Sequence, residues 1–316
     1  MSSAVADVDV CIIGSGPAAY TAALYVARAM LSVVVFEGPN PGGQLVSTTD
    51  VENYPGFDEP INGFDLVERM KKQCMRFGAQ MVGDTVASID GSRVTGQTHA
   101  VAARAIIVAT GASAKKLSFP GADELWNRGI SACAVCDGAL PCFRKRDVAV
   151  IGGGDTAMEE ALFLSKYASR VYIIHRRDKF RASAIMQQRV LENPKIRVLW
   201  NREVVEAHGE KSLEGIWLRD TTTTDDAQRH HVEVRGLFYA IGHERNVGFL
   251  PAAVARDDDG CIKVLNSTTH TTVENVFACG DVADKRYRQA ITAAGTGCQA
   301  GLDAIAYLES LECAAH

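Results

Sequence analysis

The sequence predicts an α/β fold made of two Rossmann-like nucleotide-binding units. The length of 316 residues suits two domains of ordinary size, and a hydrophobic content of 47% is enough to bury a sizeable core. The third observation is an internal repeat, because residues 8–38 and residues 146–177 share one pattern. Each copy reads as a buried parallel strand, a Gly-rich turn, an Ala/Leu-rich helix and a second β-branched strand.

The first Gly-rich turn follows a strand and opens a helix, which is the setting in which such turns bind nucleotides. Its first glycine allows a tight bend, its second lets backbone N–H groups approach a pyrophosphate, and the small residue after them lets the helix pack on the strand. The predicted contacts of this turn are Gly14, Ser15, Gly16, Pro17 and Ala18. Glu37 comes 23 residues after Gly14, where a carboxylate can accept hydrogen bonds from ribose hydroxyls. An unphosphorylated ribose, as in FAD or NAD, suits this site.

The second Gly-rich turn has the same pattern but a different neighbour. Its predicted contacts are Gly152, Gly154, Asp155, Thr156 and Ala157. The same 23-residue spacing leads from Gly152 to His175, and three arginines follow, Arg176, Arg177 and Arg181. A carboxylate there would repel a 2′-phosphate, whereas this basic cluster can pair with one through charge-assisted hydrogen bonds. The alternative is a solvated basic patch, but the equivalent register in the two copies favours an NADPH site.

A Cys-x-x-Cys pair lies just before the second copy, at Cys133 and Cys136. This spacing suits either an intramolecular redox disulfide or half of a zinc site. The sequence has no second Cys-x-x-Cys, so the redox interpretation is favoured and no metal is expected. Asp137 follows directly. It is either a cap or turn residue, or a general acid–base that moves a proton as a thiolate forms, and the residues alone leave both open.

Composition narrows the function classes further. The net charge is −5 and no clustered Lys/Arg run of the kind found in nucleic-acid-binding arms is present, which argues against nucleic acid as a partner. The N-terminus lacks the features of a signal peptide and no apolar window is long enough for a membrane span, so a cytoplasmic protein is expected. The nine cysteines are irregularly spaced, which fits a reducing compartment.

The segment from Cys133 to Ala139, the second Gly-rich turn and the segment from His175 to Arg181 closely resemble the low-molecular-weight thioredoxin reductases. The resemblance covers essentially the whole chain. It continues in Gly42-Gly-Gln44-Leu, Glu52-Asn53-Tyr-Pro-Gly56, Ala109-Thr-Gly111-Ala, Tyr239-Ala-Ile241-Gly242-His, Cys279-Gly-Asp281 and Arg288-Gln289-Ala290.

The resemblance implies a discontinuous FAD-binding domain, formed by residues 1–117 and 245–316, with an NADPH-binding domain inserted at residues 118–244. It also implies further contacts to both cofactors. Those to FAD are Gln44, Asn53, Asp281, Arg288, Gln289 and Ala290, and Ile241 would line the NADPH site.

The same resemblance implies an activity. NADPH would reduce FAD, which would reduce the Cys133–Cys136 disulfide, and the dithiol would reduce thioredoxin. Cys136 would face the flavin, Cys133 would attack thioredoxin and Asp137 would move the proton. One domain would rotate relative to the other about hinges near residues 115–120 and 242–248. A homodimer is also expected.

Related flavoproteins are the nearest alternatives. Ferredoxin- or flavodoxin-type reductases lack the paired cysteines, and small-molecule dithiol oxidases lack the basic NADPH signature. The glutathione-reductase type carries its cysteines after the first Gly-rich turn, where residues 38–60 have none. A non-catalytic redox sensor and a metal-binding module are alternatives from other classes.

Overall fold

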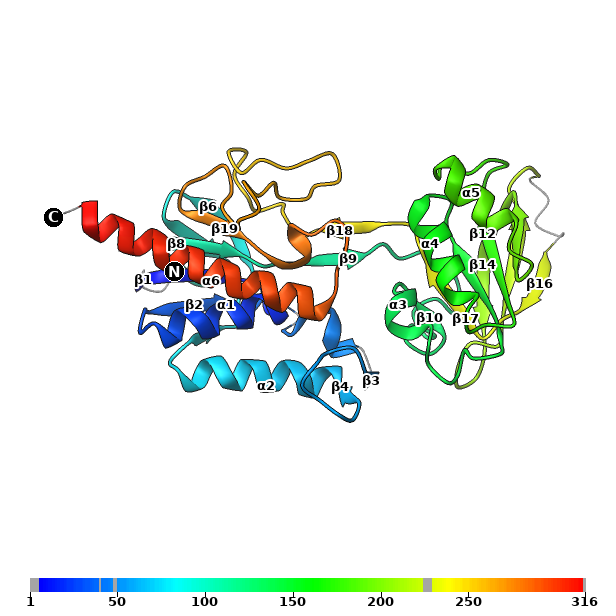
Figure 1. The fold of residues 1–316 in the computed structure, drawn as a ribbon, viewed down its shortest axis with the longest axis horizontal. Coiled ribbons are helices and arrows are strands. Elements are labelled where there is room, and N and C mark those ends of the chain that lie inside the picture. Colours follow the sequence, from blue (N-terminus) through cyan, green and yellow to red (C-terminus); the bar gives the residue numbers. More distant parts are fainter. Residues whose placement is uncertain (1–5, 40, 48–49, 224–228, 315–316) are drawn as a thin grey trace. The chain divides into compact units, whose positions relative to one another are not determined.

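A computed structural model describes residues 6–39, 41–47, 50–223 and 229–314 (Figure 1). The chain forms two compact units, residues 1–113 together with 244–316, and residues 114–243. The second unit is therefore inserted in the first. In the part of the chain that the structure describes, every helix is too short or too polar to span a bilayer.

The first unit contains a seven-stranded sheet in the order β5-β2-β1-β8-β7-β6, and β19 pairs with β8 beside this path. Strands β1, β2, β5, β8 and β19 pair in parallel, whereas β6 and β7 form an antiparallel extension on β8. The strands are β1 (Ala6–Ile13), β2 (Val33–Phe36), β5 (Gln80–Val82), β6 (Val86–Asp90), β7 (Arg93–Gly96), β8 (Ala100–Val108) and β19 (Val276–Ala278). A separate pair, β3 (Asp50–Val51) and β4 (Ile61–Asn62), precedes the second helix.

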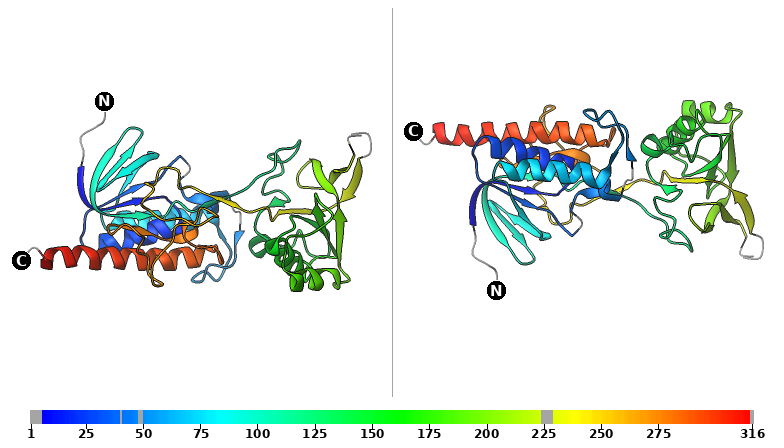
Figure 2. Two further views of the ribbon diagram at one scale, coloured as in Figure 1. Left: turned by 90° about the horizontal axis from the view of Figure 1, so that it is seen from above. Right: turned by 90° about the horizontal axis from the view of Figure 1, so that it is seen from below.

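Both faces of this sheet are buried, because successive side chains of a strand point to opposite faces. Val10 and Ile12 pack against the helices, whereas Cys11 and Ile13 pack against β6, β7 and the late-chain loops. The helices are α1 (Pro17–Arg28), α2 (Gly63–Arg76) and α6 (Ala290–Ala314), with short 3₁₀ turns η1 (Gly43–Ser47) and η2 (Gly280–Val282). Figure 2 shows α6 running alongside α1.

The α1–α6 contact depends on a glycine. A Cβ at Gly297 would lie 2.2 Å from the carbonyl oxygen of Ala18, so no larger residue fits while the two helices stay this close. The last helix of the chain is thereby packed tightly on the first.

The second unit has a five-stranded parallel sheet in the order β10-β17-β11-β12-β13, and a three-stranded antiparallel sheet in the order β14-β15-β16. The strands of the larger sheet are β10 (Ile130–Ser131), β11 (Asp147–Ile151), β12 (Arg170–His175), β13 (Ile196–Trp200) and β17 (Gly236–Tyr239). Those of the smaller sheet are β14 (Arg202–His208), β15 (Gly215–Asp220) and β16 (His230–Glu233). The helices are α3 (Ala134–Asp137), α4 (Asp155–Leu164) and α5 (Ala184–Leu191).

The larger sheet separates two hydrophobic clusters. Val148 and Val150 of β11 pack with the helices, whereas Ala149 and Ile151 pack with residues of the small sheet such as Ile216. Two short strands, β9 (Ala112–Ala114) and β18 (His243–Arg245), pair where the chain passes between the units.

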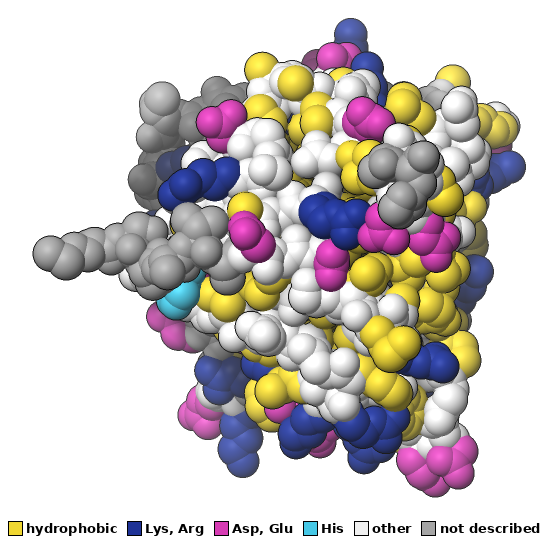
Figure 3. Space-filling model, turned by 90° about the vertical axis from the view of Figure 1, so that its left-hand side faces the viewer, with side chains coloured by type: hydrophobic (Ala, Val, Ile, Leu, Met, Phe, Trp, Pro, Cys, Tyr) yellow, Lys and Arg dark blue, Asp and Glu magenta, His cyan; other side chains and the backbone are white. Residues whose placement is uncertain are grey.

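The internal repeat corresponds to structure in both units. β1, α1 and β2 form one β-α-β unit with parallel strands, and β11, α4 and β12 form the other. The predicted α/β fold with two Rossmann-like units is confirmed. One face of the molecule carries Lys/Arg and Asp/Glu side chains interspersed with apolar ones (Figure 3).

Candidate active site

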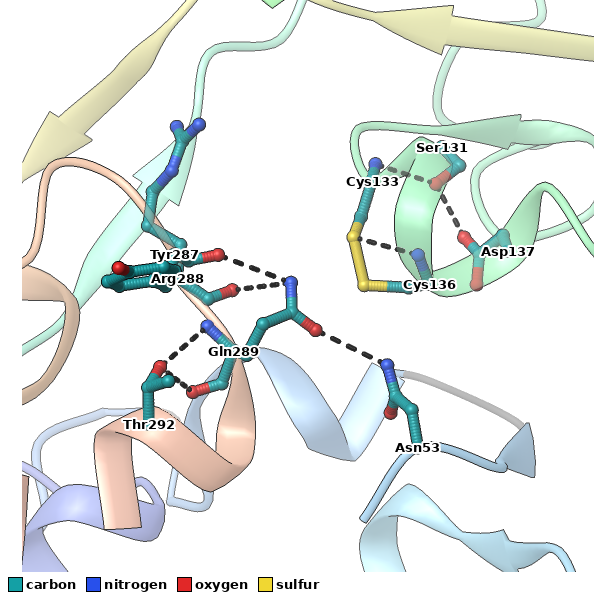
Figure 4. Close-up of a disulfide and its surroundings, with 9 residues drawn as sticks. All are labelled: Asn53, Ser131, Cys133, Cys136, Asp137, Tyr287, Arg288, Gln289 and Thr292. Atoms are coloured by element: carbon teal, nitrogen blue, oxygen red, sulfur yellow. Dashed lines mark hydrogen bonds between the residues drawn. A yellow bond between two sulfur atoms is a disulfide. The ribbon is translucent and has the colours of Figure 1, made fainter. Parts of the chain in front are cut away.

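Cys133 and Cys136 form a disulfide, with their Cα atoms 5.3 Å apart (Figure 4). The sequence spacing explains this closeness, because Cys133 is the N-cap of α3 and Cys136 lies within its single turn. The backbone N–H of Cys136 also donates to Sγ of Cys133 at 3.2 Å. A single helical turn therefore brings the two sulfurs together.

Asp137 is the last residue of α3, and its side chain is not the N-terminal cap of that helix. Its Oδ2 accepts a hydrogen bond from the Ser131 hydroxyl at 2.5 Å, and the same hydroxyl oxygen accepts the backbone N–H of Cys133 at 3.1 Å. Burial raises the pKa of Asp137, while the bond from Ser131 opposes that rise. The carboxyl therefore holds a proton more readily than a solvated aspartate, and one hydroxyl links it to the cysteine turn.

The first Gly-rich turn is built so that only glycine fits at its first position. Gly14 has φ +126°, and a Cβ there would lie 2.2 Å from the carbonyl oxygen of Ala109. A Cβ at Gly16, by contrast, would meet no atom within 4 Å, so the backbone there faces open space. Ser15 ties the turn down, donating to the backbone carbonyl of Glu37 at 2.7 Å and accepting from the N–H of Gly42 at 3.1 Å.

Glu37 is buried directly after β2, and both of its observed side-chain contacts reach one oxygen. The Tyr20 hydroxyl donates to Oε1 at 2.6 Å, and the Lys71 ammonium lies 2.7 Å from the same atom. No donor among the described residues contacts Oε2. The carboxylate is thus held from α1 and α2 with one oxygen left to accept further hydrogen bonds.

Late-chain residues meet early ones in the first unit. The Asn53 amide donates to Oε1 of Gln289 at 3.3 Å, although 236 residues separate them, and the Gln289 amide donates to the carbonyls of Tyr287 and Arg288 (Figure 4). The Gln289 N–H donates to the Thr292 hydroxyl at 3.2 Å. Ala290 begins α6, so these predicted contacts gather at its N-terminus.

Two further predicted residues of the first unit lie in short turns. The Gln44 amide donates to the backbone carbonyl of Ala112. Asp281 lies in η2, where burial raises the pKa of its carboxyl to about 6, the charge of Asp284 adds to the rise and Arg245 opposes it. Its contact to a cofactor stays a prediction, as do those of the other residues.

The second Gly-rich turn repeats the design of the first. A Cβ at Gly152 would lie 2.6 Å from the carbonyl oxygen of Ala240 and 2.7 Å from Cβ of Ala157, whereas a Cβ at Gly154 would meet nothing within 4 Å. Asp155 opens α4, and its Oδ1 accepts both the N–H and the hydroxyl of Ser183 at 2.8 Å. These bonds lower the pKa of Asp155.

The basic cluster divides into a buried member and three exposed ones. His175 is buried, its Nε2 lies 2.8 Å from the carbonyl oxygen of Lys179, and its ring packs on Phe180 and Trp200. The exposed members are Arg176, Arg177 and Arg181. His175 therefore supports the loop that carries the three arginines.

That loop is also tied to the turn and borders a cavity. The N–H of Arg181 donates to the carbonyl of Gly153 at 2.7 Å, and the carbonyl of Arg176 accepts the Thr221 hydroxyl at 2.9 Å. A cavity of about 490 Å³ adjoins Arg176; its lining residues are Arg176, Glu203, Arg219, Asp220, Thr221 and Thr223. Ile241 lies two residues after β17 and packs against the adjoining cluster.

Residues 8–297 match the pyridine nucleotide-disulphide oxidoreductase family. Thioredoxin reductase 1, mitochondrial, of Arabidopsis thaliana is 55% identical over 317 residues, covering 95% of this chain and 84% of that protein. Thioredoxin reductase of Yarrowia lipolytica is 49% identical over 308 residues, covering 93% and 96%. The chain belongs to the thioredoxin reductase family. The resemblance inferred from the motifs is thereby confirmed.

Solved structures of thioredoxin reductases are also similar to this chain. The enzyme from Giardia duodenalis has a TM-score of 0.89 at 38% identity, covering 96% of this chain and 99% of that one. The enzyme from Streptococcus pyogenes has a TM-score of 0.90 at 38% identity, covering 97% and 100%.

Three contacts of this family member were not found by sequence reasoning. The sequence carried a weak indication of the Tyr20 contact, because Tyr20 is an aromatic residue with a polar hydroxyl in the Ala-rich helix that follows the turn. Ser131 had a similar one, two residues before Cys133. The sequence carried no indication of the Lys71 contact, since a lysine on an amphipathic helix ordinarily points to solvent.

Proposed function

We propose that this chain is an NADPH-dependent thioredoxin-disulfide reductase. Electrons pass from NADPH through FAD to the Cys133–Cys136 disulfide and then to oxidised thioredoxin. The observation that carries the proposal is the disulfide on α3 in a chain that repeats one nucleotide-binding unit. Asp137, whose pKa is raised by burial, lies in the same turn and accepts a hydrogen bond from Ser131.

FAD suits the first unit. Gly16 leaves the backbone at the start of α1 open to a pyrophosphate, and the helix N-terminus favours its negative charge. Glu37 offers Oε2 to ribose hydroxyls, an acceptor that a 2′-phosphate would not tolerate. The residues proposed to hold FAD are Gly14, Ser15, Gly16, Pro17, Ala18, Glu37, Gln44, Asn53, Asp281, Arg288, Gln289 and Ala290.

NADPH suits the second unit. Gly154 leaves the start of α4 open in the same way, and three exposed arginines stand where the first unit has its carboxylate. Guanidinium groups can bind a phosphate through paired, charge-assisted hydrogen bonds. The residues proposed to hold NADPH are Gly152, Gly154, Asp155, Thr156, Ala157, His175, Arg176, Arg177, Arg181 and Ile241.

When bound, the two cofactors supply the electron pair that reduces the disulfide to a dithiol. The thiolate of Cys133 then attacks one sulfur of the thioredoxin disulfide, forming a mixed disulfide and releasing the other thioredoxin sulfur as a thiolate. Asp137 gives up its proton to a departing thiolate. Cys136 attacks Sγ of Cys133, which releases dithiol thioredoxin and restores the disulfide.

The test measures NADPH oxidation by the FAD-loaded protein with oxidised thioredoxin. Cys133→Ser and Cys136→Ser should abolish thioredoxin reduction, while NADPH still bleaches the flavin absorbance. Cys142→Ser is the matched control, an exposed thiol of the same unit, and should retain activity. If Cys133→Ser and Cys136→Ser reduce thioredoxin as fast as the wild type, the proposed electron path is refuted. Consumption of a single NADPH equivalent by the wild type would instead indicate a redox sensor.

The proposal extends to location and assembly. Seven cysteines are free thiols, which suits a reducing compartment such as the cytoplasm. A homodimer is proposed from family membership. Light scattering of the FAD-loaded protein tests the second point, and a monomeric mass at micromolar concentration would contradict it.

A further inference from the structure

Two histidines meet on the outer face of the three-stranded sheet in the second unit. Ile216 of β15 is buried in the core, so its neighbours Gly215 and Trp217 point to the other face. His208 of β14 is paired with Gly215, and His231 of β16 is paired with Trp217. Both imidazoles therefore lie on this outer face, on strands that do not adjoin each other.

The two rings converge over the glycine between them. Their Nε2 atoms are 2.8 Å apart, and their ring centroids are 5.0 Å apart at an interplanar angle of 26°. A Cβ at Gly215 would lie 2.5 Å from Nε2 of His231 and 2.7 Å from Nε2 of His208. Only glycine at this position lets the two nitrogens come together.

The arrangement matches what a divalent transition-metal ion needs from imidazole. Two nitrogens bound tetrahedrally to zinc at about 2.0–2.1 Å stand about 3.3 Å apart, so the observed pair would open by only about half an ångström. The proton shared by the two Nε2 atoms would move to Nδ1 of its own ring, which leaves both Nε2 atoms as neutral donors to the metal.

The site is open to an ion, and a carboxylate lies on the same face of the sheet. His231 is exposed and His208 half-buried, so water can complete the coordination. Glu233 is exposed and paired with Gly215, which puts a carboxylate on the same face. Among the described residues no cluster of three or more His, Cys, Asp or Glu side chains is arranged to hold a metal, so the protein would supply two ligands.

We propose that His208 and His231 form a binding site for a divalent, imidazole-preferring metal ion such as Zn²⁺, held open by Gly215. The bound ion bridges β14 and β16 across the middle strand. It is distinct from the redox cysteines and takes no part in electron transfer, so it acts on the stability of the second unit.

The structure supplies a reporter for this site. The ring of Trp217 lies 4.9 Å from that of His231, so a paramagnetic ion bound there should quench its fluorescence. Tag-free protein is titrated with Ni²⁺ while its redox disulfide is closed. The closed disulfide keeps Cys133 and Cys136 from acting as ligands. We expect saturable quenching, weakened about tenfold or more by His208→Gln or His231→Gln.

The matched control is His230→Gln. His230 is exposed and sits on the same strand, but it is paired with the core residue Leu218 and so faces the other way. Its substitution should leave the quenching unchanged. Gly215→Ala keeps both imidazoles but pushes them apart, and should weaken Ni²⁺ binding as much as losing one of them.

Thermal unfolding gives an independent measurement. Zn²⁺ should raise the unfolding temperature of the wild type and of His230→Gln, and should leave that of His208→Gln unchanged, because an ion that binds only the folded sheet stabilises it. The proposal is overturned if the His208 and His231 variants bind Ni²⁺ as the wild type does, or if His230→Gln loses binding equally.

Discussion

Glu37 follows β2 of the first unit and His175 ends β12 of the second, at equivalent places beside two turns of the same design. In both turns the first glycine is required because the chain passes too close for a side chain, and a later glycine faces open space. The side chains that follow differ in charge and in burial. We propose from this comparison that the backbone turn provides a general nucleotide site, and that the supported side chains beside it determine which nucleotide binds.

The support itself differs between the two units. In the first, the buried Tyr20 hydroxyl of α1 and the partly exposed Lys71 ammonium of α2 hold the Glu37 carboxylate. In the second, a buried histidine holds a loop, and the three arginine charges lie on that exposed loop. Four predictions test this contrast.

The largest effect is expected from removing the charges of the second unit. The double substitution of Arg176 and Arg177 by alanine should raise KM for NADPH by about 100-fold, because two charge-assisted hydrogen bonds to phosphate are lost. The kcat/KM for NADH should stay the same, since NADH has no 2′-phosphate. Arg189→Ala, an exposed arginine of α5, is the control. An equal loss with both cofactors would mean that the arginines do not select the phosphate.

The turns can be separated into structural and binding glycines. Gly152→Ala should lower the free energy of unfolding by about 2–3 kcal/mol, because its Cβ has no room beside Ala240 and Ala157. Gly154→Ala should leave stability unchanged and weaken NADPH binding, measured by calorimetry. Equal melting temperatures for the two variants would contradict this distinction.

The buried carboxyl of Asp281 in the first unit should make the stability of the protein depend on pH. Burial raises the pKa of Asp281 to about 6, above its usual 3.8, so between pH 4 and 6 the folded chain binds more protons than the unfolded chain. The contribution of this group to stability is then present at pH 4 and is lost as pH rises towards 7.

Asp281→Asn in FAD-free protein should therefore gain about 2 kcal/mol at pH 7 and only about 0.5 kcal/mol at pH 4, as measured by denaturant unfolding. Asp259→Asn, an exposed carboxylate of the same unit, should gain nothing at either pH. A gain for Asp281→Asn that is equal at the two pH values would show that charge burial is not its cause.

The smallest effect concerns the support of Glu37. Lys71→Met should weaken FAD binding about fivefold, or about 1 kcal/mol, because the carboxylate keeps Tyr20 but loses its partly exposed cation. The measurement is the FAD dissociation constant from flavin fluorescence. Lys72→Met changes the exposed neighbour on α2, and an equal loss there would contradict the assigned role.

The sequence predicted the local chemistry more fully than its surroundings. The two turns, the cysteine pair and the α/β architecture were accessible because each depends on residues close together in the chain. The contact between Asn53 and Gln289 spans 236 residues, and only the family resemblance pointed to it. No spacing rule encodes such a contact.

Burial was the property that sequence could not supply. In the sequence, His175 is the first of four neighbouring basic residues. In the structure its ring packs against Gly153 and two aromatic side chains, so it is a core residue. Asp137 left two roles open, and the structure shows that its carboxylate bonds to Ser131 and is not the N-cap of α3. Its acid–base role stays a prediction.

The order of the chain has a consequence for its synthesis. The sheet of the first unit is completed by β19, and its helical layer by α6, both of which leave the ribosome last. The inserted unit is contiguous and can fold while β8 of the first unit still lacks its neighbour β19 and α1 still lacks α6. During that interval the nascent chain exposes surface that chaperones recognise, and termination before Gly297 would leave α1 uncovered.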